Sequence, residues 1–321
     1  MRHGTIDSAT ANGLKFLRER IEAADIPSSC LDETINIATW NIREFGKKDR
    51  AEASIHYIAE IINQFDLVAL TELRDNLGDL KRVMKLLGRY WDVIYCDYID
   101  DPGGNKERMA FLFDKRAVVF TGLAAELDPA RVKTESGEYL SKINWWRSPY
   151  MASFSSGSFD FVMIMAHIRW GKSTKSRLGP LNLLADWINQ RRESNFAVDK
   201  DIILLGDFNI TSKRSSLFKA VTSKGLMLPN ALSKRKIGTN LSQAKFYDQI
   251  LHYPTHPERF TENAGILDFY GGDEANIEKY FPGSGLSKSK FTYQLSDHLP
   301  LWAQINVDLE EDELNQLLSR G

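Results

Sequence analysis

The chain has 321 residues, of which 43% are hydrophobic and 26% are charged, a composition typical of a soluble globular protein with a substantial core. Its formal net charge of −2 excludes a global electrostatic commitment to nucleic acid, so a polyanionic ligand needs a local basic patch. Two cysteines are too few for a disulfide framework.

The first ninety residues alternate between helices and short apolar strands. Residues 1–33 form an N-terminal extension with a short amphipathic helix, because Leu14, Leu17 and Ile21 recur at helical spacing and Pro27 follows them. The next expected elements are a strand at 35–41, a helix at 55–65, a strand at 67–70 and a helix at 80–87.

After residue 90, many strands follow one another without a helix between them. The expected strands lie at 91–95, 109–113, 118–120, 151–154, 159–166, 202–205, 246–251 and 301–307. A polar connection spans 121–145, a helix near 181–188 precedes the strand at 202–205, and a helical tail occupies 309–321. Strands paired in this way favour a β-sandwich covered by helices over a simple parallel sheet.

The cysteines and the apolar runs bear on the location of the protein. Cys30 and Cys96 form no CxxC zinc motif and suit a reducing compartment, although a single disulfide between them stays open. The first residues lack the apolar region of a signal peptide, and the longest apolar run, 161–166, is too short to cross a bilayer. We therefore expect a cytoplasmic protein with no membrane association and no evident obligate protein partner.

One motif combines a buried strand with two polar side chains. Asp207 and Asn209 follow the strand at 202–205 through Gly206, which lets the backbone turn tightly. In extended backbone, a spacing of two residues points both side chains to the same side, so a carboxylate and a carboxamide are presented together. A hard metal ion and a phosphate can both be held there. Alone, the motif is better explained as a turn, because Asp and Asn are common turn residues.

Polar residues recur at the ends of the other expected strands as well. The set is Asn41, Glu72, Glu107, His167, Asp207, Asn209, Asp248, Asp297 and His298. For any single position a structural role is the better explanation, such as a cap, a turn or a hydrogen-bonded core histidine. Nine such residues at strand ends instead indicate one collected site.

The motifs around these residues resemble the endonuclease/exonuclease/phosphatase superfamily. The matching segments are 39–42, 70–72, 106–113, 147–149, 166–167, 206–209, 247–250 and 296–300. The Gly-Asp-Phe-Asn and Ser-Asp-His-x-Pro pair, in that order, is the most specific part, and segment 106–113 leans towards the deoxyribonuclease I-like branch. Thr71 departs from the Gln found in many members. The residues after Asn209 depart from the inositol-polyphosphate 5-phosphatase pattern.

The resemblance implies an α+β fold, a four-layer α/β/β/α sandwich in which two mixed β-sheets pack face to face with helices on the outer faces. It implies one such domain over residues 34–308. It also implies hydrolysis of a phosphoester with Mg²⁺, or Mn²⁺, as the cofactor.

The metal and phosphate ligands carried over from the resemblance are five residues. Glu72 is the principal metal ligand, helped by Asn41 and Asp297, which fits the preference of Mg²⁺ for oxygen ligands. Asn209 donates a hydrogen bond to the substrate phosphate, and Arg147 holds the phosphate with its planar guanidinium.

The catalytic residues implied by the resemblance are two histidine–carboxylate pairs and one further carboxylate. His298, oriented by Asp248, activates the attacking water, and His167, oriented by Glu107, protonates the leaving oxygen. Asp207 assists the placement of the metal or the nucleophile. An imidazole suits proton transfer because its unperturbed pKa is about 6.5.

Local charge favours nucleic acid as the substrate partner, with DNA preferred. Basic residues follow His167 and Asn209, and aromatic residues adjoin Arg147, which suits a nucleic-acid backbone with bases available for stacking. The predicted function is a metal-dependent DNA endonuclease. A small-molecule or lipid phosphodiesterase or phosphatase of the same superfamily is the alternative. A catalytically silent binding module is a third reading, which the complete residue set opposes.

Overall fold

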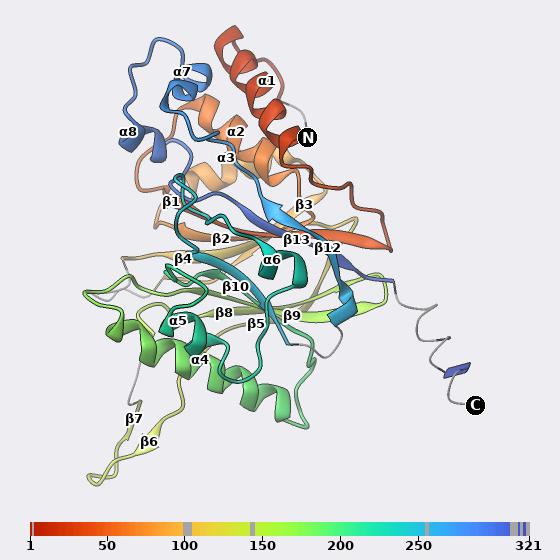
Figure 1. The fold of residues 1–321 in the computed structure, drawn as a ribbon, viewed down its shortest axis with the longest axis vertical. Helices are drawn as coiled ribbons and strands as arrows, with labels where there is room; N and C mark the ends of the chain where they lie inside the picture. Colours follow the sequence, from red (N-terminus) through yellow and green to blue (C-terminus); the bar gives the residue numbers. More distant parts are fainter. Residues whose placement is uncertain are drawn as a thin grey trace.

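The computed structural model describes residues 1, 3–98, 105–141, 145–253, 257–308, 314, 317 and 318. Two mixed β-sheets pack face to face, and helices cover both outer faces (Figure 1). This confirms the predicted four-layer sandwich. Most of the predicted tail, 309–321, lies outside the described residues.

The six-stranded sheet has a parallel pair at its centre. Its strand order is β12 (Phe260–Ile266), β13 (Leu301–Asn306), β1 (Thr34–Phe45), β2 (Leu67–Leu73), β4 (Arg108–Asp114) and β3 (Trp91–Tyr95). Only β1 and β2 run parallel, and Asn41 lies opposite Thr71 near their carboxyl ends. This pairing places Asn41 and Glu72 at one edge of the sheet.

The five-stranded sheet repeats this arrangement. Its order is β11 (Asp248–His252), β10 (Ile202–Asp207), β9 (Phe159–His167), β8 (Tyr150–Ser156) and β5 (Val119–Glu126). Here β9 and β10 are the parallel pair, and His167 lies opposite Asp207. A small hairpin of β6 (Val132–Lys133) and β7 (Tyr139–Leu140) projects from the body (Figure 1).

The helices are divided between the two outer faces. The six-stranded sheet is covered by α1 (Ser8–Ala23), α2 (Glu52–Ile62), α3 (Gly78–Leu87), α7 (Ile277–Tyr280) and α8 (Lys288–Thr292) (Figure 1). The five-stranded sheet is covered by α4 (Lys175–Glu193) and α5 (Ser216–Val221), and α6 (Asn230–Lys234) lies near β12. The predicted helix of the N-terminal extension is α1, which Asp7 caps and which buries Leu14 and Leu17 in the main core. None of the helices in the described ranges is both long and apolar enough to cross a membrane.

Strand β9 shows how one apolar run supplies two cores. Because successive side chains in a strand point to opposite faces, Met163 and Met165 pack between the sheets while Val162 and Ile164 pack towards α4. A strand buried on both faces carries a continuous apolar sequence. Its polar residues are therefore confined to its ends, which is where His167 lies.

Candidate active site

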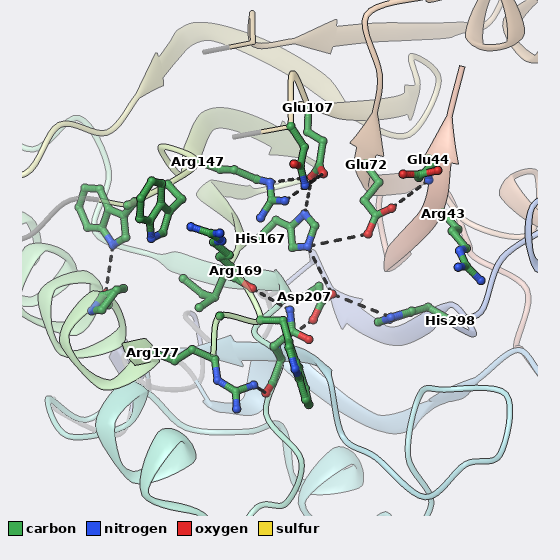
Figure 2. A pocket seen from close by; sticks show the side chains of 18 of the residues that line it. Arg43, Glu44, Glu72, Glu107, Arg147, His167, Arg169, Arg177, Asp207 and His298 are labelled. Carbon is green, nitrogen blue, oxygen red and sulfur yellow. Dashed lines mark hydrogen bonds and ion pairs between the residues drawn. The ribbon is translucent and has the colours of Figure 1, made fainter. Parts of the chain in front are cut away.

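The polar strand ends from both sheets meet in a cleft of about 810 Å³. Strands β1 and β2 bring Asn41 and Glu72 to it, and β9 and β10 bring His167 and Asp207. Figure 2 shows Glu72, Glu107, His167, Asp207 and His298 pointing towards one another. The cleft lies where the carboxyl ends of the two parallel pairs meet.

Two of the site residues adopt backbone conformations that non-glycine residues rarely occupy. The φ of Glu72 is 65° and that of Asn209 is 52°. Both pairings of β2 shift register around Glu72, as in a β-bulge, which re-aims a side chain next to a site. Gly206 is also required, because a Cβ there would lie 2.0 Å from the carbonyl oxygen of Ala166. Strain of this kind costs roughly 1–3 kcal/mol per residue and clusters at functional sites.

The first histidine–carboxylate pair joins His298 to Asp248. The Nδ1 atom of His298 lies 2.8 Å from Oδ2 of Asp248, and both side chains are buried. Ser296 fixes the preceding turn, since its hydroxyl accepts a hydrogen bond from the backbone N–H of His298 and donates one to the carbonyl of Asn41. Burial opposes protonation of His298, but Asp248 and Asp207 outweigh it and raise the pKa of the imidazole well above 6.5.

The second pair joins His167 to Glu107, and Arg147 completes it. Nδ1 of His167 lies 3.0 Å from Oε2 of Glu107. Nε of Arg147 lies 2.6 Å from that same oxygen, and its Nη2 donates to Oε1 at 2.9 Å. Two nitrogen atoms of Arg147, the residue expected to hold a phosphate, therefore contact Glu107. Its buried Nη1 has no hydrogen-bond partner among the described residues.

Asp207 lies between the two histidines. Its Oδ2 atom is 3.6 Å from Nε2 of His167, 3.9 Å from Nε2 of His298 and 3.1 Å from Nδ2 of Asn41. Burial is the largest influence on its carboxyl group and raises its pKa to about 6, although the histidines oppose this shift. One carboxylate therefore faces both imidazoles across a space into which a reacting group can enter.

The remaining predicted site residues are placed around this centre. Asn209 donates its side-chain N–H to the carbonyl of Ile168 at 2.7 Å and its backbone N–H to Asp207. The side chain of Asp297 is 44% exposed and lies 3.7 Å from Arg43. All ten predicted site residues thus lie in or directly beside the cleft, and Asp248 reaches it through His298.

The donors in the cleft fit a hard divalent cation. Oε1 of Glu72 accepts a hydrogen bond from Asn41 at 2.8 Å, and the buried Oδ1 of Asn41 has no hydrogen-bond partner within the described ranges. Asp207, Asp248 and His298 also bring three ligand atoms within 4.8 Å of one another. Oxygen atoms dominate both groups, as Mg²⁺ and Mn²⁺ prefer.

Several cleft residues carry no signal in the motif analysis. Arg43, Trp170 and Tyr293 line the cleft with the predicted residues. Arg43 stacks on the ring of Tyr293 at 4.0 Å, a contact between β1 and the segment after α8. Two of them could have been predicted from their closeness in sequence to a site residue, because Arg43 follows Asn41 by two residues and Trp170 follows His167 by three.

Replacing Glu107 by glutamine is expected to make the free energy of unfolding depend less on pH in the acidic range. Burial alone would raise the pKa of Glu107, but His167 and Arg147 outweigh it and lower the pKa from 4.5 to about 2. A carboxylate with a lowered folded-state pKa stabilises the fold above pH 4.5, and this contribution is lost as the pH falls towards 2. It amounts to about 3 kcal/mol at neutral pH.

Urea unfolding of the wild type and Glu107→Gln between pH 2 and pH 7 measures this contribution. The difference in unfolding free energy should be largest near pH 7 and should shrink towards pH 2. A difference that stays constant over the whole range would show that the ion pair is not its source.

The chain is similar to known proteins in sequence and in structure. Bovine deoxyribonuclease-1 is 26% identical over 236 residues, which cover 68% of this chain and 77% of that protein. The mannosyl-6-phosphatase of Bacteroides thetaiotaomicron has a similar structure, with a TM-score of 0.54, 17% identity, and coverage of 84% of this chain and 98% of the other. Caenorhabditis elegans TDP2 gives a TM-score of 0.55 at 15% identity, covering 85% and 97%.

These two structural similarities show the fold alone, since their identities are low. The family model is broader evidence, because it spans the strands and turns that deliver the site residues. It matches residues 38–298, from β1 to His298. The chain therefore belongs to the Endonuclease/Exonuclease/phosphatase family.

Proposed function

We propose that this member of a family of phosphoester hydrolases is a Mg²⁺-dependent nuclease that hydrolyses phosphodiester bonds, with DNA as the favoured substrate. The observation that carries the proposal is the placement of Asp207 between two imidazoles, each held by its own carboxylate. A water molecule and a leaving oxygen on opposite sides of one phosphorus atom need such a pair of proton-transfer groups.

In this proposal the two histidines have opposite tasks. His298, held by Asp248, takes a proton from the attacking water through Nε2. His167, held by Glu107, gives a proton to the leaving oxygen through its own Nε2. Asp248 fixes the tautomer of His298 by accepting from its Nδ1, and Glu107 lies 3.0 Å from Nδ1 of His167, so each carboxylate stabilises its imidazolium. Asp207 faces both Nε2 atoms and helps to orient the nucleophile.

The substrate phosphate lies between these groups and is held by donors at the cleft wall. Asn209 keeps one amide hydrogen for the phosphate while the other binds Ile168. The unpaired Nη1 of Arg147 is a second donor. The metal ligands are Glu72, Asn41 and Asp297, with Asp207 at their side. When bound, a divalent cation would offset the negative charge of these carboxylates, would thereby oppose protonation of His298, and would polarise the phosphoryl oxygen.

Nucleic acid is favoured by the charge and chemistry of the cleft wall. Arg43, Arg169, Lys172 and Arg177 line the cleft wall, where their side chains can contact a phosphate backbone. The similarity to bovine deoxyribonuclease-1 also favours a nucleic-acid substrate. A phosphatase acting on a small molecule is the second candidate, which the similarity to the mannosyl-6-phosphatase favours. The cytoplasmic location stays a prediction from the sequence.

A panel assay with purified protein tests the proposal. It uses supercoiled plasmid, single-stranded DNA, RNA, abasic duplex, an inositol phosphate, a sugar 6-phosphate and sphingomyelin, each with Mg²⁺ or Mn²⁺ and with or without EDTA. We expect cleavage of nucleic acid that EDTA abolishes. Activity confined to the small molecules would replace the nuclease by the phosphatase, and inactivity on every substrate would favour the binding module.

A further inference from the structure

Two tryptophans that line the cleft have about half of their surface exposed. Trp146 is 47% exposed and Trp170 is 50% exposed, and both line the cleft. Their neighbour Trp145 is a useful contrast, because it is only 6% exposed and donates its indole N–H to the carbonyl of Pro180. Trp145 therefore has a packing role, whereas the surfaces of Trp146 and Trp170 are left open at the substrate side.

Each exposed indole is backed by a guanidinium group. Arg169 lies over the ring of Trp146 at 4.4 Å, and Arg177 lies over the ring of Trp170 at 4.3 Å. Arg177 is itself buried and fixed, since its Nη1 donates to the carbonyl of Asn209 at 2.7 Å. A cation packed on one face of a ring restricts the motion of the ring, so little conformational entropy is lost when a ligand stacks on the other face.

The two rings are connected to different histidine pairs. Trp146 precedes Arg147, the residue that binds Glu107 beside His167. Trp170 meets the ring of Tyr247 edge-on at 5.7 Å, and Tyr247 packs on the ring of His298 at 5.5 Å. The exposed rings are therefore joined by short chains of contacts to the groups that act on the attacking and the leaving oxygen.

We propose that Trp146 and Trp170 are stacking platforms for unpaired nucleobases next to the scissile phosphate, so that the substrate is a single strand or a locally unpaired strand. This inference rests on the proposed nuclease function and narrows it. Aromatic rings stack on any base without reading its sequence, and basic side chains follow the backbone. In a continuous duplex the faces of each base are covered by its neighbours, so the rings reach them only at a strand end or after unpairing.

The test compares three probes of the same strand length, with rates and concentrations expressed per phosphodiester because the duplex carries twice as many as each single strand. They are a twelve-nucleotide thymidine strand, a strand of twelve base-free tetrahydrofuran units, and a twelve-base-pair duplex. Cleavage in Mg²⁺ gives kcat and KM for the wild type and for Trp146→Ala, Trp170→Ala, Trp146→Phe and Trp170→Phe. Phe196→Ala is the matched control, because Phe196 is a 97% exposed aromatic residue after the far end of α4 and does not line the cleft.

We expect the wild type to prefer the thymidine strand over both other probes. Each alanine variant should lose about 5- to 100-fold in kcat/KM on that strand, mainly through KM, so that its preference over the base-free strand falls. The phenylalanine variants should recover part of the loss, and Phe196→Ala should behave as the wild type. Thermal unfolding checks that each variant is folded.

Three results would overturn the inference. They are equal cleavage of the thymidine and base-free strands by the wild type, equal losses on both strands in the alanine variants, and a preference for the duplex. In each of these cases nucleic acid is still cleaved, so the proposed function stands. If no probe is cleaved while a phosphomonoester is hydrolysed, the proposed function fails and the inference fails with it.

Discussion

His298→Ala is expected to lose about 10²- to 10⁴-fold in kcat/KM for phosphodiester cleavage at neutral pH. In the proposed reaction, Nε2 of His298 takes the proton of the attacking water, and alanine offers no acceptor. The fold should persist, because the imidazole contacts Asp248 and Tyr247 but the backbone turn is held by Ser296. Initial rates on single-stranded DNA at saturating Mg²⁺, together with thermal unfolding, measure both effects.

Adding free imidazole distinguishes two causes of lost activity in His298→Ala, namely loss of the general base and disruption of the fold. The alanine variant leaves a space beside Asp248 that free imidazole can occupy, so part of the activity should return with a dependence on imidazole concentration. His252→Gln is the control, since His252 is also a buried histidine but packs on Phe260 away from the cleft. Near-wild-type turnover of His298→Ala would refute the assignment of His298 as the base.

Glu72→Gln is expected to raise the Mg²⁺ concentration needed for half-maximal activity by on the order of 10- to 100-fold or more. Glutamine keeps the shape of the side chain and can still accept the hydrogen bond from Asn41, but it removes one negative charge from the proposed metal ligands. With that bond kept, the amide NH2 of glutamine faces the backbone N–H of Glu44, which in the wild type donates to Oε2 of Glu72 at 2.9 Å, so the metal-free variant should lose about 1–3 kcal/mol of unfolding free energy.

Thermal unfolding during a Mg²⁺ titration gives a readout that does not depend on catalysis. The wild type should unfold at higher temperature as Mg²⁺ is added, because a ligand that binds the folded state stabilises it. Glu72→Gln should need far more Mg²⁺ for the same increase. Glu44→Gln is the matched control, since Glu44 lines the same cleft but is engaged by Lys47 and Arg74. An unchanged Mg²⁺ requirement in Glu72→Gln would remove Glu72 from the metal ligands.

The gathering of polar side chains at the ends of buried strands could be predicted from the sequence for a physical reason. A strand buried on both faces, such as β9 or β10, tolerates polar side chains only where it ends, so His167 and Asp207 stand out against an apolar run. Parallel neighbours then bring such ends together, as the pairing of His167 with Asp207 does.

Edge strands were the least predictable part of the fold. Residues 121–126 were expected to belong to a polar connection, but they extend β5 at the sheet edge, where one face meets solvent and polar residues are tolerated. Strand β12 was not predicted at all, because its sequence, Phe-Thr-Glu-Asn-Ala-Gly-Ile, carries turn-forming residues and also lies at an edge.

Contacts between distant side chains could not be predicted either. The motif containing Arg147 suggested a phosphate ligand but gave no sign that its guanidinium also pairs with Glu107, forty residues earlier. Likewise, the convergence of His167 and His298 on Asp207 depends on how the two sheets pack, and the bulge at Glu72 depends on the register of β2. Strand period and spacing carry no information on these distances.

In the proposed reaction this cleft hydrolyses nucleic-acid phosphodiesters by attack of an activated water on phosphorus. The most direct measurement is the Mg²⁺ assay on single-stranded DNA run in water enriched in oxygen-18, with mass analysis of the products. We predict that each cleavage places one oxygen-18 atom on the product phosphate and that EDTA abolishes cleavage. Cleavage that continues in EDTA, or product phosphates without oxygen-18, would contradict the claim.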